Sequence, residues 1–320
     1  MFFIPVAIMA LLIFIFGEVF MRTKNINMLS GPITKGLISL SIPIMVMNIM
    51  TSVFNLIDMT ALRIFSDESA VGAVGACGTL ITLCISLLVG TSVGASVIVA
   101  KRIGAGDKKQ TEKAVTTALL IALLGSVVLL GIGATFSKTF LEWINCPAEL
   151  LPRAANYLRI YFYGLPFYMF YTFCASILRA MGDTKRPMYF MILGGAIKVV
   201  FTVLFVTTLD VDVEGAAFST MIANVIESSL AFFAVYKTKE YFRINLKKFE
   251  LDLKAFKEIL QVGIPTGITV SSISASLHVK ACIHVECRTS KALCSLGTCC
   301  KTSLAPVIVE EVDISHRLVG

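Results

Sequence analysis

The sequence predicts an all-α polytopic membrane protein in which six helices cross the bilayer. The chain is 56% hydrophobic and only 15% charged, and its mean hydropathy is +0.83, far outside the range of soluble domains. Six long apolar stretches lie between about Gly36 and Tyr236. Each must be a helix, because a backbone in lipid has to satisfy its hydrogen bonds within its own segment.

The six spans are expected where an apolar stretch reaches about 20 residues, the length that crosses the hydrocarbon core. They run at about 37–63, 70–100, 113–136, 156–180, 187–209 and 213–236. Basic residues fall on every second connection, whereas the connection at 210–214 is purely acidic. Since basic connections face the cytoplasm, the N-terminus of the six-helix region is predicted to be cytoplasmic. The net charge of +7 then favours membrane lipids as partners over nucleic acid.

Residues 1–27 form a hydrophobic N-terminal extension followed by a basic leader. Phe2 to Phe20 is almost unbroken apolar sequence, without the basic start and small-residue cleavage site of a signal peptide. It is a seventh span, a peripheral arm, or sequence ahead of a translation start at Met21. The last is favoured, because Met21 opens a basic leader that suits a cytoplasmic start.

After the six-helix region, 28–240, residues 241–268 are predicted to form a cytoplasmic amphipathic linker and the start of a second half. Phe249, Leu253, Phe256 and Leu260 recur at helical spacing. The segment KEILQVGIP at 257–265 also echoes KGLISLSIP at 35–43. Such an echo is expected where a repeat begins.

Residues 269–320 are expected to be a non-native or disordered tail. There is no Phe, Tyr or Trp from Lys257 onward, yet all three histidines and five of the nine cysteines lie in the last 43 residues. This break in composition indicates a reading-frame shift near Gly267. A Cys/His metal site is the alternative, but the cysteine spacing does not match a CXXC framework, so no metal site is expected.

Four segments carry a resemblance to a known family: GLISLSIPIMVMNIMTSVFNLID, GTSVGASVIVAKRIGAGD, YLRIYFYGLPFYMFYTFCASILRAMGDTKRP and VEGAAFSTMIAN. Together they closely resemble the N-terminal lobe of the multidrug and toxic compound extrusion (MATE) family, over about Met28 to Gly267. The resemblance implies twelve helices in two lobes around a central cavity, of which this chain holds one six-helix lobe. It also implies a bacterial inner-membrane antiporter that exports organic cations or drugs in exchange for Na+ or H+, with no cofactor and no enzymatic activity.

Two glycine-containing turns are part of this resemblance, RAMGDTKRP after the fourth span and KRIGAGDKK after the second. In each, a glycine is expected to adopt a positive φ beyond the end of a helix. Their basic residues would hold both turns at the cytoplasmic surface. These turns are therefore interpreted as architecture, not as the site of transport.

An ionisable side chain inside a span is a candidate functional residue, because its charge is costly in lipid unless it is paired or hydrated. Asp58, Lys198 and Glu227 lie in the first, fifth and sixth spans. Asp58 matches the first-helix acid that the resembled family uses for cation coupling, so binding of H+ or Na+ there would alternate with substrate. The alternative is an aspartate that only reaches the outer surface.

Lys198 departs from the family pattern, which leads us to expect an amide there and an amide or acid at Thr202, one turn further on. A lysine about 11 residues into a span lies near the midplane and needs a counter-ion. Asp58 and Glu227 are the two candidates. If Lys198 pairs with Asp58, its ammonium occupies the place of the coupling cation, and coupling would be altered or lost.

Neutral oxygen atoms near the same cavity are expected from Thr220 and Asn224 on the sixth span and from Asn48 on the first. For each of them, a role in helix packing is the alternative. Methionine and aromatic side chains suit promiscuous amphiphilic substrates. The substrate cavity is therefore predicted to involve Met47, Phe54, Tyr168 and Tyr171.

Two other functions stay open at this point. A flippase for a lipid-linked precursor has a related architecture, but it should carry more basic residues that face the cavity. A non-transporting membrane fragment of a disrupted gene is the second. One lobe cannot complete a substrate site between two lobes, unless two copies pair as a homodimer.

Overall fold

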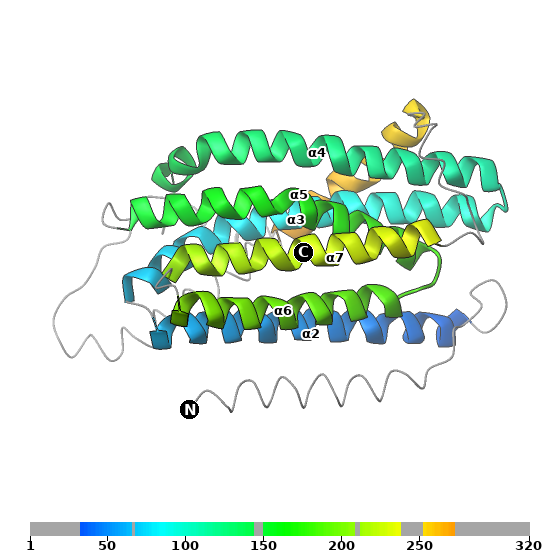
Figure 1. The fold of residues 1–320 in the computed structure, drawn as a ribbon. Coiled ribbons are helices and arrows are strands. Elements are labelled where there is room, and N and C mark those ends of the chain that lie inside the picture. The colour runs from blue at the N-terminus through cyan, green and yellow to red at the C-terminus, as the bar shows by residue number, and fades with distance from the viewer. Residues whose placement is uncertain (1–32, 66–67, 144–149, 209–211, 238–251, 273–320) are drawn as a thin grey trace, which may run out of the picture. The chain divides into compact units, whose positions relative to one another are not determined.

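The computed structural model describes residues 33–65, 68–143, 150–208, 212–237 and 252–272. The predicted all-helical lobe is confirmed, since each of the six predicted spans coincides with one helix (Figure 1), except that residue 209 lies outside the described residues. A further helix covers residues 253–272. The labelled helices are α2 (Ile33–Phe65), α3 (Glu68–Gly104), α4 (Lys108–Trp143), α5 (Leu151–Ala180), α6 (Lys185–Thr208) and α7 (Asp212–Lys237).

Five of these helices contain a stretch that is long and apolar enough to cross a membrane. Among the six labelled helices the exception is α5, which carries Arg153, Arg159 and Arg179. The helix packs against α3, α4 and α7, while Arg153 and Arg159 lie on its exposed surface.

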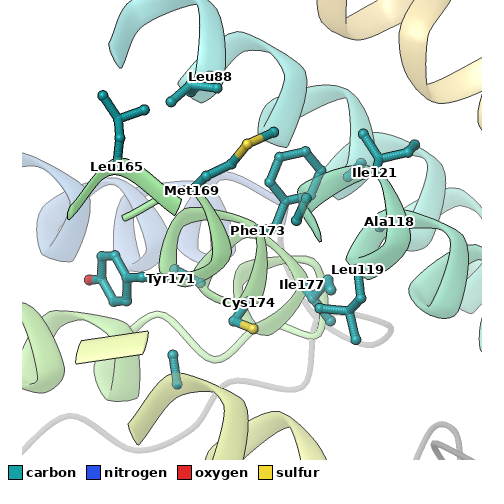
Figure 2. Close-up of a cluster of buried hydrophobic side chains, with 14 of the residues drawn as sticks. Leu88, Ala118, Leu119, Ile121, Leu165, Met169, Tyr171, Phe173, Cys174 and Ile177 are labelled. Carbon is teal, nitrogen blue, oxygen red and sulfur yellow. The ribbon is translucent and has the colours of Figure 1, made fainter. Parts of the chain in front are cut away.

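The main core lies along α5, and Figure 2 shows its centre. Phe173, Cys174 and Ile177 are fully buried on one stretch of α5. Leu88 of α3 and Leu119 of α4 belong to the same cluster (Figure 2). This packing fixes α3, α4 and α5 relative to one another.

A second, smaller cluster lies between α2 and α6, which run side by side in Figure 1. Met50 and Phe54 of α2 pack there with Met188 and Val199 of α6. Since α6 also packs against α7 and α7 against α5, α2 is joined to the main core through α6 and α7. The arrangement places the mid-span residues of α2, α6 and α7 close together.

Both turns with predicted left-handed glycines have them, with φ of 73° at Gly106 and 85° at Gly182. An L side chain rarely adopts this region, which is why glycine follows each helix end. An aspartate then caps the next helix. The Asp107 carboxylate accepts hydrogen bonds from two backbone amides at the start of α4, and Asp183 accepts one from Arg186 at the start of α6.

The helix at 253–272 packs on α3 through small residues. The expected apolar stripe included Leu253, but that side chain is 73% exposed. The buried positions are Ala255, Ile259, Gly263 and Gly267, each four residues after the last. At the two glycines, the backbone of this helix contacts the backbone of α3. The face of the helix that packs on α3 is therefore the one with the smallest side chains.

The same helix is held at its start by Arg102, a residue at the end of α3 that is only 8% exposed. Its guanidinium donates to the backbone oxygen of Gln110 at 3.0 Å and to Glu258 at 3.3 Å, and lies 3.6 Å from Asp252. Arg102 therefore joins the end of α3 to the start of α4 and to the helix at 253–272. From the sequence, it was only one of the basic residues that indicate the cytoplasmic side. Residues 253–268 of the predicted linker and second-half start lie within one continuous helix.

The hydrophobic extension and leader at 1–27, Phe249 and most of the tail at 269–320 lie outside the described residues. So do the cysteines and histidines of the alternative metal site.

Candidate functional site

Asp58 of α2 and Lys198 of α6 form an ion pair in the interior of the lobe. The distance between Lys198 Nζ and Asp58 Oδ2 is 2.5 Å, and the side chains are 19% and 13% exposed. A charge-assisted contact of this kind needs two helices in contact at one level, which the packing of α2 on α6 provides. Of the two counter-ions considered for Lys198, the contact is with Asp58.

The other carboxylate oxygen of Asp58 faces a pair of hydroxyl groups. Thr202 Oγ1 lies 3.4 Å from Asp58 Oδ1 and 2.6 Å from Ser219 Oγ, and both hydroxyl-bearing residues are buried. A hydroxyl donates one hydrogen, so Thr202 donates either to Asp58 or to Ser219. The hydrogen bond that Thr202 donates can therefore switch between Asp58 and Ser219 as the charge on Asp58 changes.

Ser219 was not anticipated from the sequence, which pointed to its neighbour Thr220. The hydroxyls of Ser219 and Thr220 both lie 2.9 Å from the backbone oxygen of Ala216 on their own helix, and that of Ser219 also contacts Thr202. Adjacent residues on a helix point about 100° apart, so only one of the two can face α6. The available signal was Thr202 itself, because a buried hydroxyl in a span calls for a polar partner on the facing helix.

Glu227 of α7 approaches the same face of α6, one turn nearer the start of that helix. Its side chain is 7% exposed and rests on Gly194, where an added Cβ atom would overlap the carboxyl group. Within the described part of the chain, Glu227 has neither a hydrogen bond nor a salt bridge. Its electrostatic interaction is with Lys198, which stands one turn after Gly194.

The remaining predicted oxygen donors are not gathered around Asp58. Asn224 is buried at 8% exposure on α7, one turn before Glu227 and five residues after Ser219. Asn48 is exposed on α2, and ten residues, nearly three turns, separate it from Asp58. The structure thus brings together Asp58, Lys198, Thr202 and Ser219, with Glu227 close by.

Met47 and Phe54 of the predicted substrate cavity lie in the packed cluster between α2 and α6, at 8% and 4% exposure. Tyr171 is also buried, and its hydroxyl donates to the backbone oxygen of Pro187 at 3.1 Å. Tyr168 is half-buried on α5 and interacts electrostatically with Glu227. Contact with substrate stays a prediction for all four residues.

Gly195→Ala is expected to lower the free energy of unfolding by about 1 to 3 kcal/mol, because the new methyl group would overlap the ring of Phe54. The Phe54 ring is buried against α6 and has little room to retreat. Thermal unfolding in detergent measures the change. Gly131→Ala is the matched control, since nothing lies within 4 Å of its Cβ position. Equal stability of the two variants would contradict the close packing of α2 on α6.

A helical membrane bundle with a carboxylate and a lysine paired inside its spans is typical of a secondary transporter. The chain belongs to the MATE family: the model of the MatE family matches residues 43–204. This confirms the family indicated by the sequence motifs.

Two curated relatives and one solved structure illustrate the similarity. The chain is 27% identical to "Probable multidrug resistance protein YoeA" of Bacillus subtilis (strain 168), over 73% of this chain and 52% of the relative. It is 22% identical to "Multidrug export protein MepA" of Staphylococcus aureus (strain bovine RF122 / ET3-1), over 73% and 52%.

The solved structure is "Outward-facing conformation of a multidrug resistance MATE family transporter of the MOP superfamily". Its TM-score is 0.73 at 28% identity, and the match covers 80% of this chain and 57% of that one. The chain therefore spans about half the length of the relatives that it matches.

Proposed function

We propose that this chain is the N-terminal lobe of a secondary active antiporter that exports organic cations and other drugs in exchange for Na+ or H+. The half-buried Asp58–Lys198 pair carries the proposal, because an ion pair within the spans of a MATE-family lobe is costly and is not required for helix packing. The names of the relatives, which refer to multidrug resistance and export, support the substrate class. The proposed location is the inner membrane of a bacterium.

The proposed orientation places the N-terminus of the lobe in the cytoplasm. The end of α3 carries Lys101 and Arg102, and α4 begins at Lys108. The turn between α5 and α6 carries Arg179, Lys185 and Arg186. These basic turns follow the odd-numbered helices α3 and α5, so both belong to the same side of a membrane that all six helices cross.

Lys198 gives the antiporter a feature of its own, because its ammonium already neutralises Asp58. A coupling cation that reaches Asp58 has to displace Lys198 first. The flippase alternative gains no support from this pair, since Lys198 is bound to a carboxylate of the protein and is not free to hold a phosphate.

Asp58→Asn is expected to abolish export, since an amide cannot exchange one cation for another. The test is accumulation of a cationic dye in bacteria that lack their own drug exporters and produce the chain. Cells with the unaltered chain should retain less dye than empty-vector cells, and cells with Asp58→Asn should match the empty vector. Lys138→Gln is the control, because Lys138 is 66% exposed and pairs only with Glu142 at 3.9 Å.

Two outcomes would contradict this proposal. If the unaltered chain leaves dye retention unchanged, the lobe does not export such cations by itself, and crosslinking then shows whether two copies assemble. If export persists with its Na+ or pH dependence intact in Lys198→Asn, then Lys198 has no part in coupling. Flipping of a lipid-linked precursor, assayed in the same cells, separates the remaining alternative.

A further inference from the structure

We propose that Glu227 holds a proton while Lys198 is paired with Asp58, and that Lys198 moves between the two carboxylates as a tethered cation. The proton on Glu227 leaves when Lys198 arrives. This inference rests on the proposed antiport and assigns a second, exchangeable proton site to it.

One face of α6 places the two carboxylates on either side of Lys198. Gly194, Lys198 and Thr202 follow one another at intervals of four residues and so lie on one face of the helix. Glu227 rests on Gly194, and Asp58 lies against Thr202. The two carboxylates therefore lie about one turn to either side of Lys198, roughly 5 to 6 Å along the axis each. The flexible four-carbon stem of a lysine spans such a distance.

The number of charges leaves one of the two carboxylates without a positively charged partner. Two carboxylates share one lysine, and the lysine contacts Asp58. Glu227 is 7% exposed and lacks a hydrogen bond or salt bridge among the described residues. An ionised carboxylate in such a place is costly, and a proton is the smallest ligand that removes the charge.

The other groups around Glu227 do not supply a second positive charge. From α5, Tyr168 and Tyr171 interact with it electrostatically. Arg179 of α5 interacts with both tyrosines, but the positive charge that acts on Glu227 is that of Lys198. The group on α6 that faces Glu227 is Lys198. Asp58 of α2 contacts that lysine. Between its ends α3 has no charged residue. Lys198 is thus the cation that decides whether Glu227 is neutral or ionised.

The exchange balances in charge. A coupling cation that enters from the outer side binds Asp58 and releases the Lys198 ammonium. The ammonium moves one turn toward the cytoplasmic end of α6 and pairs with Glu227. The carboxyl group of Glu227 gives up its proton toward the cytoplasm as the pair forms. One positive charge enters at Asp58 and one leaves at Glu227.

Infrared spectroscopy of the purified chain in sodium-free buffer at neutral pH tests this without transport. The unaltered chain should show the carbonyl band of a protonated carboxyl group, and Glu227→Gln should lose it. Asp58→Asn should lose it too, because Lys198 then pairs with Glu227 and ionises it. Lys198→Met should enlarge the band roughly twofold, since both carboxylates then need a proton.

Glu214→Gln is the matched control on α7, because Glu214 accepts a hydrogen bond from Asn156 at 3.1 Å, far from Lys198 along the helix. Its spectrum should equal that of the unaltered chain. If a variant does not fold, titration of the unaltered chain still decides, since the band must disappear as the pH rises. Absence of a band that Glu227→Gln removes would overturn the inference. Dye export could persist in that case, so the two proposals fail separately.

Discussion

Removal of both carboxylates near Lys198, in Asp58→Asn with Glu227→Gln, is expected to lower the free energy of unfolding by about 3 to 5 kcal/mol. Lys198 is 19% exposed in the interior of the lobe, and without either carboxylate its ammonium stays buried and uncompensated. Asp58→Asn alone should cost less, because Glu227 lies one turn away. The measurement is unfolding of the purified chain in mixed micelles with increasing denaturing detergent.

Addition of Lys198→Met to the double variant should restore most of the lost stability, because the uncompensated charge is then gone. Lys138→Gln should change stability by less than about 0.5 kcal/mol, as expected for an exposed pair. If the triple variant were no more stable than the double, the cost would come from altered packing and not from charge. The buried pair would then have little energetic weight.

Gly94→Leu is expected to separate the helix at 253–272 from α3. A Cβ atom at Gly94 would lie 2.5 Å from the backbone oxygen of Ile259 and 2.7 Å from the backbone nitrogen of Gly263. Backbone atoms cannot rotate away as a side chain can, so the contact has to open. The expected loss is about 1 to 3 kcal/mol or more. Hydrogen exchange at residues 253–272 should speed up, as measured by mass spectrometry.

Gly75→Leu is the control within α3, because Gly75 is exposed and nothing lies within 4 Å of its Cβ position. It should leave exchange at residues 253–272 unchanged. Protection of that helix in Gly94→Leu, at the level of the unaltered chain, would show that the glycine contact does not hold it. Arg102 would then be the main attachment, through Glu258 and Asp252.

The features that the sequence predicted well depend on local chemistry. Helix ends followed from the length of apolar stretches and from turn residues, such as Gly182 with its positive φ and Asp183 as a cap. The membrane class followed from hydropathy alone. Asp58, Lys198 and Glu227 stood out because charge is rare in a span, a property of each residue and its neighbours in the chain.

The features that the sequence missed depend on how helices are rotated against each other. Thr220 and Ser219 are equally polar, and only the packing of α7 on α6 selects Ser219. The stripe on the helix at 253–272 was assigned to large apolar side chains, whereas contact with α3 selects Gly263 and Gly267. Hydropathy gives small residues little weight, although they allow the closest approach of two helices.

For this chain, the sequence by itself determined a six-helix membrane lobe, its family and the three charges in its spans. Only the tertiary structure decided that Lys198 contacts Asp58, that Glu227 has no salt bridge to any residue that the structure describes, and that Arg102 is a buried attachment point. The physical reason is the distance along the chain over which each interaction acts. A helix and its ends follow from hydrogen bonds and hydropathy over a few residues, but a pair such as Asp58 and Lys198 joins residues far apart in the chain and depends on the packing of whole helices.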